Sequence, residues 1–145
     1  MAVKTNVKTR VLVVDDHQPF RRLVCSMLQE QGSVEVVGEA QDGLEAVQQA
    51  ELLQPDIVVL DIGLPGLSGI EVARQISKVA AAAKIIFLTQ ERSPDVVKMA
   101  FGVGGQGYVI KAQAGAELLA AMDAVVHGSK FVSSGIDEPD KPGVA

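Results

Sequence analysis

Short apolar runs alternate along the chain with longer stretches in which apolar residues recur every three or four positions. Five of these runs lie at residues 11–14, 36–37, 57–60, 85–88 and 108–110, and most of them are rich in Val and Ile. Consecutive apolar residues are typical of strands that are covered on both faces of a parallel sheet. The longer stretches predict amphipathic helices between the strands. The alternation therefore predicts an α/β fold built from five strand–helix units, a doubly wound parallel sheet with right-handed crossovers.

Capping residues and breakers mark most of the predicted helix ends. Four starts are expected near Pro19, after the Asp42–Gly43 turn, at Ser68 with Glu71 three positions later, and at Ser93 before Pro94. The buried face of the first helix is predicted to hold Phe20, Leu23, Val24, Met27 and Leu28. Gly32 is expected to stop this helix and Gly128 to stop the fifth. The fifth helix has a clear apolar face, but no Ser, Thr, Asp or Asn precedes it as a cap.

Composition narrows the function classes. The 145 residues include 18 acidic and 13 basic side chains, giving a net charge of −5, which is the wrong sign for coating DNA or anionic lipid. Aromatic residues make up 3% with no Trp, which disfavours a reader of single-stranded nucleic acid. The single cysteine, Cys25, fits a reducing cytoplasm. A polar N-terminus and short apolar runs predict neither a secretory signal nor a membrane span.

Carboxylate, hydroxyl and ammonium side chains directly follow four of the five predicted strands. Asp15 and Asp16 follow the first, Asp61 the third, Thr89 the fourth and Lys111 the fifth. In an open α/β sheet, the carboxyl ends of the strands line the ligand site. Three carboxylates about 5 Å apart repel by about 3 kcal/mol per pair at an effective dielectric constant of about 20. Lys111 and a divalent cation such as Mg²⁺ would balance them and leave room for one phosphoryl group.

The segments that carry these residues resemble the receiver domain of two-component response regulators. They are Val11–Asp16, Pro55–Gly69, Phe87–Thr89 and Gly107–Lys111. The Gln54-Pro55-Asp56 lead-in and the Gly128–Ser133 ending resemble the NarL/FixJ type. The resemblance implies a flavodoxin-like three-layer sandwich with a five-stranded sheet in the order 2-1-3-4-5. It covers residues 10–128, with residues 1–9 as an extension and residues 129–145 as a flexible tail or linker.

The resemblance also implies how the site works. Asp61 would accept a phosphoryl group from a sensor histidine kinase. Asp16, Asp61 and the backbone carbonyl of Gly63 would hold Mg²⁺, with Asp15 acting partly through water. The metal and Lys111 would stabilise charge on the phosphoryl oxygens.

A second set of residues is implied to transmit and modulate the signal. Thr89 would hydrogen-bond the phosphoryl group, and Tyr108 would change rotamer as Thr89 moves. Gly63, Gln90 and Glu91 occupy positions that modulate access to Asp61, and Gln90 is a departure because the family usually has a small residue there.

The implied function is a switched signalling module and not an enzyme. The implied output is control of transcription, with contact to DNA only through an output domain that this chain lacks, and a second copy of the chain, in a homodimer, is a candidate partner. Two alternatives remain open: a stand-alone receiver, and a pseudo-receiver that binds proteins without phosphorylation.

A haloacid-dehalogenase-type phosphohydrolase would need an Asp-x-Asp pattern after the first strand. A flavodoxin-like electron carrier would need a Ser/Thr-Gly-rich phosphate loop there, and neither pattern is present.

Overall fold

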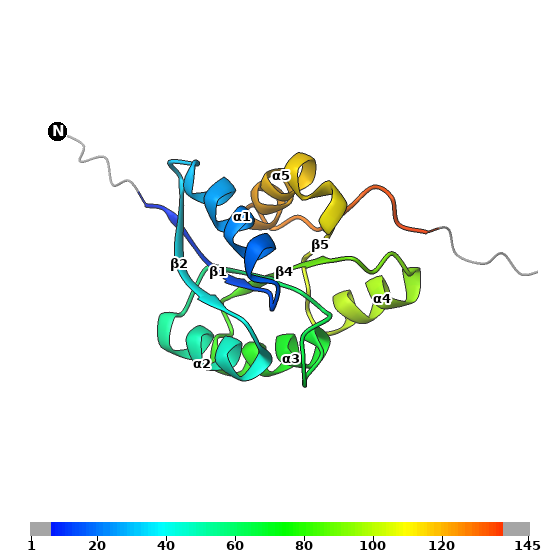
Figure 1. The fold of residues 1–145 in the computed structure, drawn as a ribbon, viewed down its shortest axis with the longest axis horizontal. Coiled ribbons are helices and arrows are strands. Elements are labelled where there is room, and N and C mark those ends of the chain that lie inside the picture. Colours follow the sequence, from blue (N-terminus) through cyan, green and yellow to red (C-terminus); the bar gives the residue numbers. More distant parts are fainter. Residues whose placement is uncertain (1–6, 138–145) are drawn as a thin grey trace, which may run out of the picture.

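A parallel sheet separates two layers of helices in the computed structural model, which describes residues 7–137 (Figure 1). The strands are β1 (Thr9–Val14), β2 (Val34–Ala40), β3 (Ile57–Leu60), β4 (Lys84–Thr89), β5 (Gly107–Ile110) and β6 (Phe131–Val132). Within the described residues they form one sheet in the order β2-β1-β3-β4-β5-β6. Every pair is parallel. The carboxyl ends of β1, β3, β4 and β5 therefore meet at one edge of the sheet.

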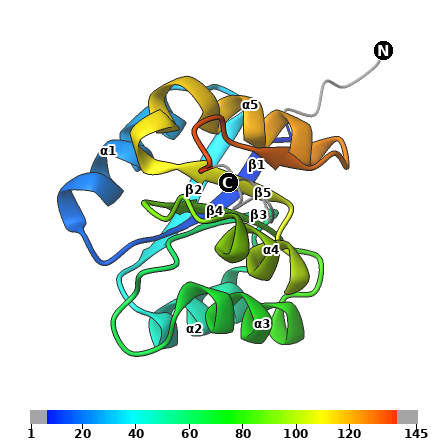
Figure 2. The same ribbon diagram turned by 90° about the vertical axis from the view of Figure 1, so that its right-hand side faces the viewer.

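The helices cover both faces of this sheet. They are α1 (Gln18–Gln29), α2 (Gly43–Leu53), α3 (Gly69–Val79), α4 (Pro94–Gly102) and α5 (Ala114–Val126), and a 3₁₀ turn at Lys111–Gln113 precedes α5. Helices α1 and α5 lie on one face, and α2, α3 and α4 lie on the other (Figure 2). None of the helices between residues 7 and 137 is long and apolar enough to cross a membrane.

The core is divided between the two faces by the alternation of side chains along each strand. On β1, Val11 and Val13 pack with α1 and α5, whereas Leu12 and Val14 pack with α2 and α3. All four side chains are at most 1% exposed. This two-sided burial is why the strand shows a continuous apolar run, and it confirms the three-layer fold predicted from that run.

The predicted number of strands was wrong by one. The strand order 2-1-3-4-5 is confirmed, but β6 adds a sixth strand within the segment that was predicted to be a tail or linker. Two residues are too few to give a periodic signal, and β6 exists because the edge of β5 offers it a partner. At the other edge of the sheet, β2 spans seven residues, although only the apolar pair at residues 36–37 marked this strand in the sequence. Its side chains are mostly half-buried, so it lacks a continuous apolar run.

Helix α1 is turned relative to its predicted face. Leu23 was expected to be buried but is 64% exposed, while Cys25 is buried at 5%. On the surface of the helix, Leu23 and Cys25 lie on opposite sides of the stripe formed by Val24 and Leu28. Periodicity alone therefore does not decide which of the two faces the sheet. The predicted stop at Gly32 was also wrong, because the helix ends earlier, at Gln29. The predicted starts of the next three helices are confirmed, and Asp42, Ser68 and Ser93 cap them by accepting a backbone N–H with the side chain.

Candidate functional site

Three carboxylates gather where the strands β1 and β3 end. The two strands are neighbours in register, with Val14 opposite Leu60, so Asp15 and Asp61 emerge side by side. One carboxylate oxygen each from Asp15, Asp16 and Asp61 lies within 4.8 Å of the other two. Asp15 and Asp61 are buried, at 3% and 6% exposure, whereas Asp16 is exposed. The structure thus brings together the acidic residues that the sequence pointed to.

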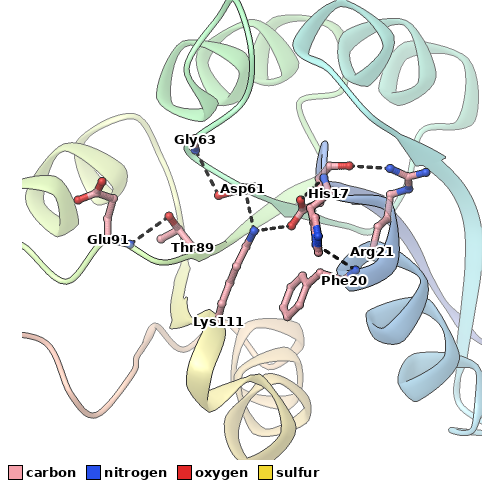
Figure 3. A network of polar contacts seen from close by, with 9 residues as sticks. His17, Phe20, Arg21, Asp61, Gly63, Thr89, Glu91 and Lys111 are labelled. Atoms are coloured by element: carbon pink, nitrogen blue, oxygen red, sulfur yellow. Dashed lines mark hydrogen bonds and ion pairs between the residues drawn. The ribbon is translucent and has the colours of Figure 1, made fainter.

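Lys111 is the cation that faces this acidic cluster (Figure 3). Its Nζ lies 2.7 Å from Asp15 Oδ2 and 2.9 Å from Asp61 Oδ2. Burial alone would lower the pKa of Lys111, but the hydrogen bonds to both carboxylates outweigh it and raise the pKa above its usual value. The ring of Phe20, 4.8 Å from Nζ, adds a cation–π contact. Lys111 therefore stays charged and offsets much of the repulsion between the two buried carboxylates.

Backbone N–H groups fix the orientation of the two buried carboxylates. The N–H of His17 donates to Asp15 Oδ1 at 2.8 Å, and the N–H of Gly63 donates to Asp61 Oδ1 at 3.2 Å. The exposed His17 also caps α1, since its Nδ1 accepts from the N–H of Phe20 at 3.4 Å. In each carboxylate, one oxygen is thus held by the backbone while the other faces Lys111. Such fixed oxygen ligands suit a hard divalent cation.

A hollow of about 330 Å³ opens over the cluster. It is lined by Asp16, His17, Asp61, Ile62, Gly63, Thr89, Gln90, Glu91 and Lys111. A second hollow of about 570 Å³ lies beside it, and the exposed Gln90 and the ammonium-bearing Lys111 line both. A side chain at position 63 would meet nothing within 4 Å, so Gly63 leaves its side of the hollow open. The three predicted access modulators therefore all border the space above Asp61.

Thr89 and Tyr108 are linked through one residue of the loop after β4. The N–H of Glu91 donates to Thr89 Oγ1 at 3.3 Å, and the Tyr108 hydroxyl donates to the Glu91 carbonyl at 2.8 Å. Tyr108 is fully buried against Phe87. Burial, followed by the charges of Glu91 and Asp61, raises the pKa of Tyr108 to about 12, so its hydroxyl remains a donor at neutral pH. A movement of Thr89 would therefore reach Tyr108 through the backbone of Glu91.

Arg21 is a site residue that the sequence interpretation missed. Its Nε donates to Glu39 Oε1 at 2.9 Å, and its Nη1 donates to the backbone carbonyl of Asp15 at 2.8 Å. Only 11% of its side chain is exposed. Arg21 thereby fixes the peptide group between Asp15 and Asp16 and ties it to β2. The only sign of this role in the sequence was a basic residue one position outside the apolar stripe of α1. Such a residue does not indicate which groups accept its hydrogen bonds.

Gly69 fixes the loop that presents Asp61. Its N–H donates to the Ile62 carbonyl at 2.7 Å, and a Cβ at this position would lie 2.1 Å from the Asp61 carbonyl oxygen. Because that atom belongs to the backbone, it cannot move away without displacing Asp61. We expect Gly69→Ala to lower the free energy of unfolding by about 3 kcal/mol or more.

Urea unfolding would measure this cost. Gly115→Ala is the matched control, because Gly115 lies in α5 and a Cβ there meets nothing within 4 Å. We expect the control to be neutral or stabilising, by up to about 1 kcal/mol. Equal stability of Gly69→Ala and the wild type would show that α3 does not constrain the Asp61 loop.

Comparison with known proteins agrees with this geometry. The family model "Response regulator receiver domain" matches residues 11–123. The Bacillus subtilis transcriptional regulatory protein LiaR is 36% identical over 125 residues, which is 86% of this chain and 59% of LiaR. A crystal structure of a LuxR-family two-component response regulator from Aurantimonas superposes with a TM-score of 0.85 at 36% identity, covering 89% of this chain and 92% of that one.

Another similar structure was solved in the presence of a phosphate mimic. The isolated REC domain of RcsB from Salmonella enterica, solved in the presence of phosphomimetic BeF₃⁻, matches with a TM-score of 0.82 at 25% identity, over 89% of this chain and 96% of that one. The chain belongs to the receiver domain family of two-component response regulators. It spans somewhat under three fifths of the curated relatives it matches, 59% in the case of LiaR.

Proposed function

We propose that Asp61 accepts a phosphoryl group from the phosphohistidine of a sensor histidine kinase. A carboxylate oxygen of Asp61 attacks phosphorus, the P–N bond breaks, and its electron pair stays on the imidazole, which takes up a proton. The observation that carries the proposal is the placement of Asp61: a buried carboxylate that opens into a hollow, with a lysine ammonium at 2.9 Å and two further carboxylates beside it.

The charges around Asp61 support this chemistry. Oxygens of Asp15, Asp16 and Asp61 and the Gly63 carbonyl would hold Mg²⁺, and the bound ion supplies positive charge to the phosphoryl oxygens. Lys111 contacts Asp15 and Asp61 together, so it can keep one carboxylate contact and turn its remaining N–H groups to the phosphoryl group. Stabilisation of charge by such preorganised donors is the main source of catalysis in phosphoryl transfer.

Thr89 and Tyr108 would convert this chemical change into a conformational one. A phosphoryl group adds about −1.5 to −2 charges and three strong acceptors. The Thr89 hydroxyl, which now accepts from the N–H of Glu91, would move toward a phosphoryl oxygen and donate to it, and this movement would break the contact with Glu91. Glu91 and the Tyr108 hydroxyl would then lose their present arrangement, and Tyr108 would change rotamer. Gln90, at the border of both hollows, would slow the entry of small phosphodonors.

Incubation with acetyl phosphate and Mg²⁺, followed by intact-mass measurement, tests the proposal. We expect a gain equal to one phosphoryl group, and no gain when EDTA removes the metal. BeF₃⁻, which was present with the RcsB neighbour, gives a second readout that does not depend on hydrolysis. The fluorescence of Tyr108, the single tyrosine, should change when BeF₃⁻ binds. If neither reagent acts on the folded protein in the presence of Mg²⁺, the proposal is wrong.

For the output, we propose control of transcription through a DNA-binding domain outside this chain. The support is the name of LiaR, a transcriptional regulatory protein, together with the acidic balance of the chain itself, which does not suit DNA. A sensor kinase in a reducing cytoplasm is the proposed donor, and association with a second copy of the chain is a further proposed interaction. Gel shifts with this chain alone should show no specific DNA binding.

A further inference from the structure

The residues after α5 form a strap across the edge of the sheet. We call residues 129–137 the C-terminal strap. Its strand β6 pairs in parallel with β5, with Phe131 opposite Gly107 and Val132 opposite Tyr108. The N–H of Phe131 donates to the Gln106 carbonyl at 3.0 Å, and the N–H of Ser133 donates to the Tyr108 carbonyl at 2.8 Å. The strap is therefore bonded to the backbone of the residue whose side chain contacts the loop after β4.

Glu117, in the first turn of α5, anchors the middle of the strap. Its carboxylate accepts from the Ser133 hydroxyl, from the Ser134 hydroxyl at 2.8 Å and from the Ser134 N–H at 3.2 Å. Ser133 is buried at 5% exposure. These hydrogen bonds, the one to Ser133 first, lower the pKa of Glu117, although burial opposes the shift. The carboxylate therefore stays charged at neutral pH and holds both serines.

Arg92 anchors the far end of the strap to the loop between β4 and α4. The N–H of Asp137 donates to the Arg92 carbonyl at 2.9 Å, and Arg92 Nη1 donates to the Gly135 carbonyl at 3.0 Å. Ile136 packs against the core cluster that contains Ala100 of α4 and Tyr108. Arg92 follows directly after Glu91, which holds both Thr89 and Tyr108. One short loop thus contacts the site on one side and the strap on the other.

We propose that the strap and phosphorylation of Asp61 oppose each other through this loop. The docked strap holds the loop in the conformation in which the N–H of Glu91 binds Thr89. Movement of Thr89 toward a phosphoryl group shifts Glu91 and Arg92, and the Arg92 contacts to Gly135 and Asp137 break. The proposal rests on the proposed function of Asp61 and adds the route by which the change reaches the chain beyond residue 137.

Linkage makes the proposal quantitative. If BeF₃⁻ binding weakens the strap contacts by some factor, loss of those contacts must strengthen BeF₃⁻ binding by the same factor. Coupling between two sites in a protein typically amounts to about 5-fold to 150-fold. We therefore expect a variant with a weakened strap to bind BeF₃⁻ at least about 5-fold more tightly.

Hydrogen–deuterium exchange of the full chain, with and without BeF₃⁻ and Mg²⁺, tests the first direction. The amides of Phe131, Ser133 and Asp137 are hydrogen-bonded in the strap and should exchange slowly. We expect peptides that cover residues 129–137 to exchange at least about 5-fold faster once BeF₃⁻ is bound. Unchanged exchange while calorimetry shows BeF₃⁻ bound would overturn the strap proposal alone. Absence of BeF₃⁻ binding together with no mass gain from acetyl phosphate would overturn the proposed function, and the strap proposal with it.

Glu117→Ala tests the reverse direction. It removes the anchor of Ser133 and Ser134, so exchange in the strap should be fast before BeF₃⁻ is added and BeF₃⁻ should bind more tightly. Glu71→Ala is the matched control, because Glu71 is also the acidic residue in the first turn of a helix but contacts Arg74, away from the strap. Ser134→Ala is a milder second variant that removes one hydroxyl contact. BeF₃⁻ affinity equal to that of the wild type in Glu117→Ala, with a freely exchanging strap, would contradict the coupling.

Discussion

Asp61→Asn is expected to abolish the mass gain on incubation with acetyl phosphate and Mg²⁺. The amide is nearly the same size as the carboxylate, and its oxygen can still accept from the N–H of Gly63. It lacks the negative charge needed to attack phosphorus. Lys111 keeps its contact with Asp15, and the repulsion between the carboxylates falls, so the fold should persist.

Asp56→Asn is the matched control for this substitution. Asp56 is an exposed carboxylate just before β3, at the opposite end of the same strand, and it accepts from the N–H of Arg10 at 2.8 Å. The control should gain one phosphoryl group as the wild type does. A gain that survived in Asp61→Asn would place the phosphoacceptor elsewhere in the chain.

Lys111→Met should slow phosphoryl transfer by about 100-fold or more, which is the usual cost of removing one donor that stabilises developing charge. The methionine retains much of the aliphatic length but removes the ammonium that contacts Asp15 and Asp61. Breaking a buried ion pair from one side costs about 3–5 kcal/mol, because the remaining charge is left without a partner. We therefore expect a loss of stability of this order in EDTA, and a partial recovery in Mg²⁺.

The time course of the intact mass would give the rate, and urea unfolding with EDTA or Mg²⁺ would give the stability. Lys84→Met is the control, since Lys84 is also a half-buried lysine, donating to the Val125 carbonyl at 2.9 Å at the other end of β4. The Lys84→Met variant should accept the phosphoryl group at the wild-type rate. An unchanged rate in Lys111→Met would show that the ammonium takes no part in the reaction.

The central strands and the residues after them could be predicted because a single physical cause produces both signals. Burial on both faces makes Val11–Val14 and Ile57–Leu60 continuous apolar runs, and the parallel arrangement then sends Asp15 and Asp61 to the same edge. Register between neighbouring strands brings their carboxylates together, so the order of motifs along the chain was sufficient to locate the cluster.

Contacts that depend on two distant side chains were not predictable. Arg21 reaches both Glu39 and the Asp15 carbonyl only because α1 is turned as it is, and the same turn exposes Leu23. The strap has a composition typical of a linker, with small and polar residues around Phe131. Its order comes from acceptors supplied by Glu117 and Arg92, which no local pattern in residues 129–137 reveals.

The strand β6 also forms the edge of the sheet beside β5. An unpaired edge strand presents a row of free N–H and C=O groups on which another chain can build a sheet, a route to aggregation. Here the four residues of β5 are partly covered by a strand of two residues, which is itself too short to template a neighbour. The polar strap thus protects one side of the sheet from self-association, and an extended hydrophobic terminal strand in its place would have left the protein exposed to that risk.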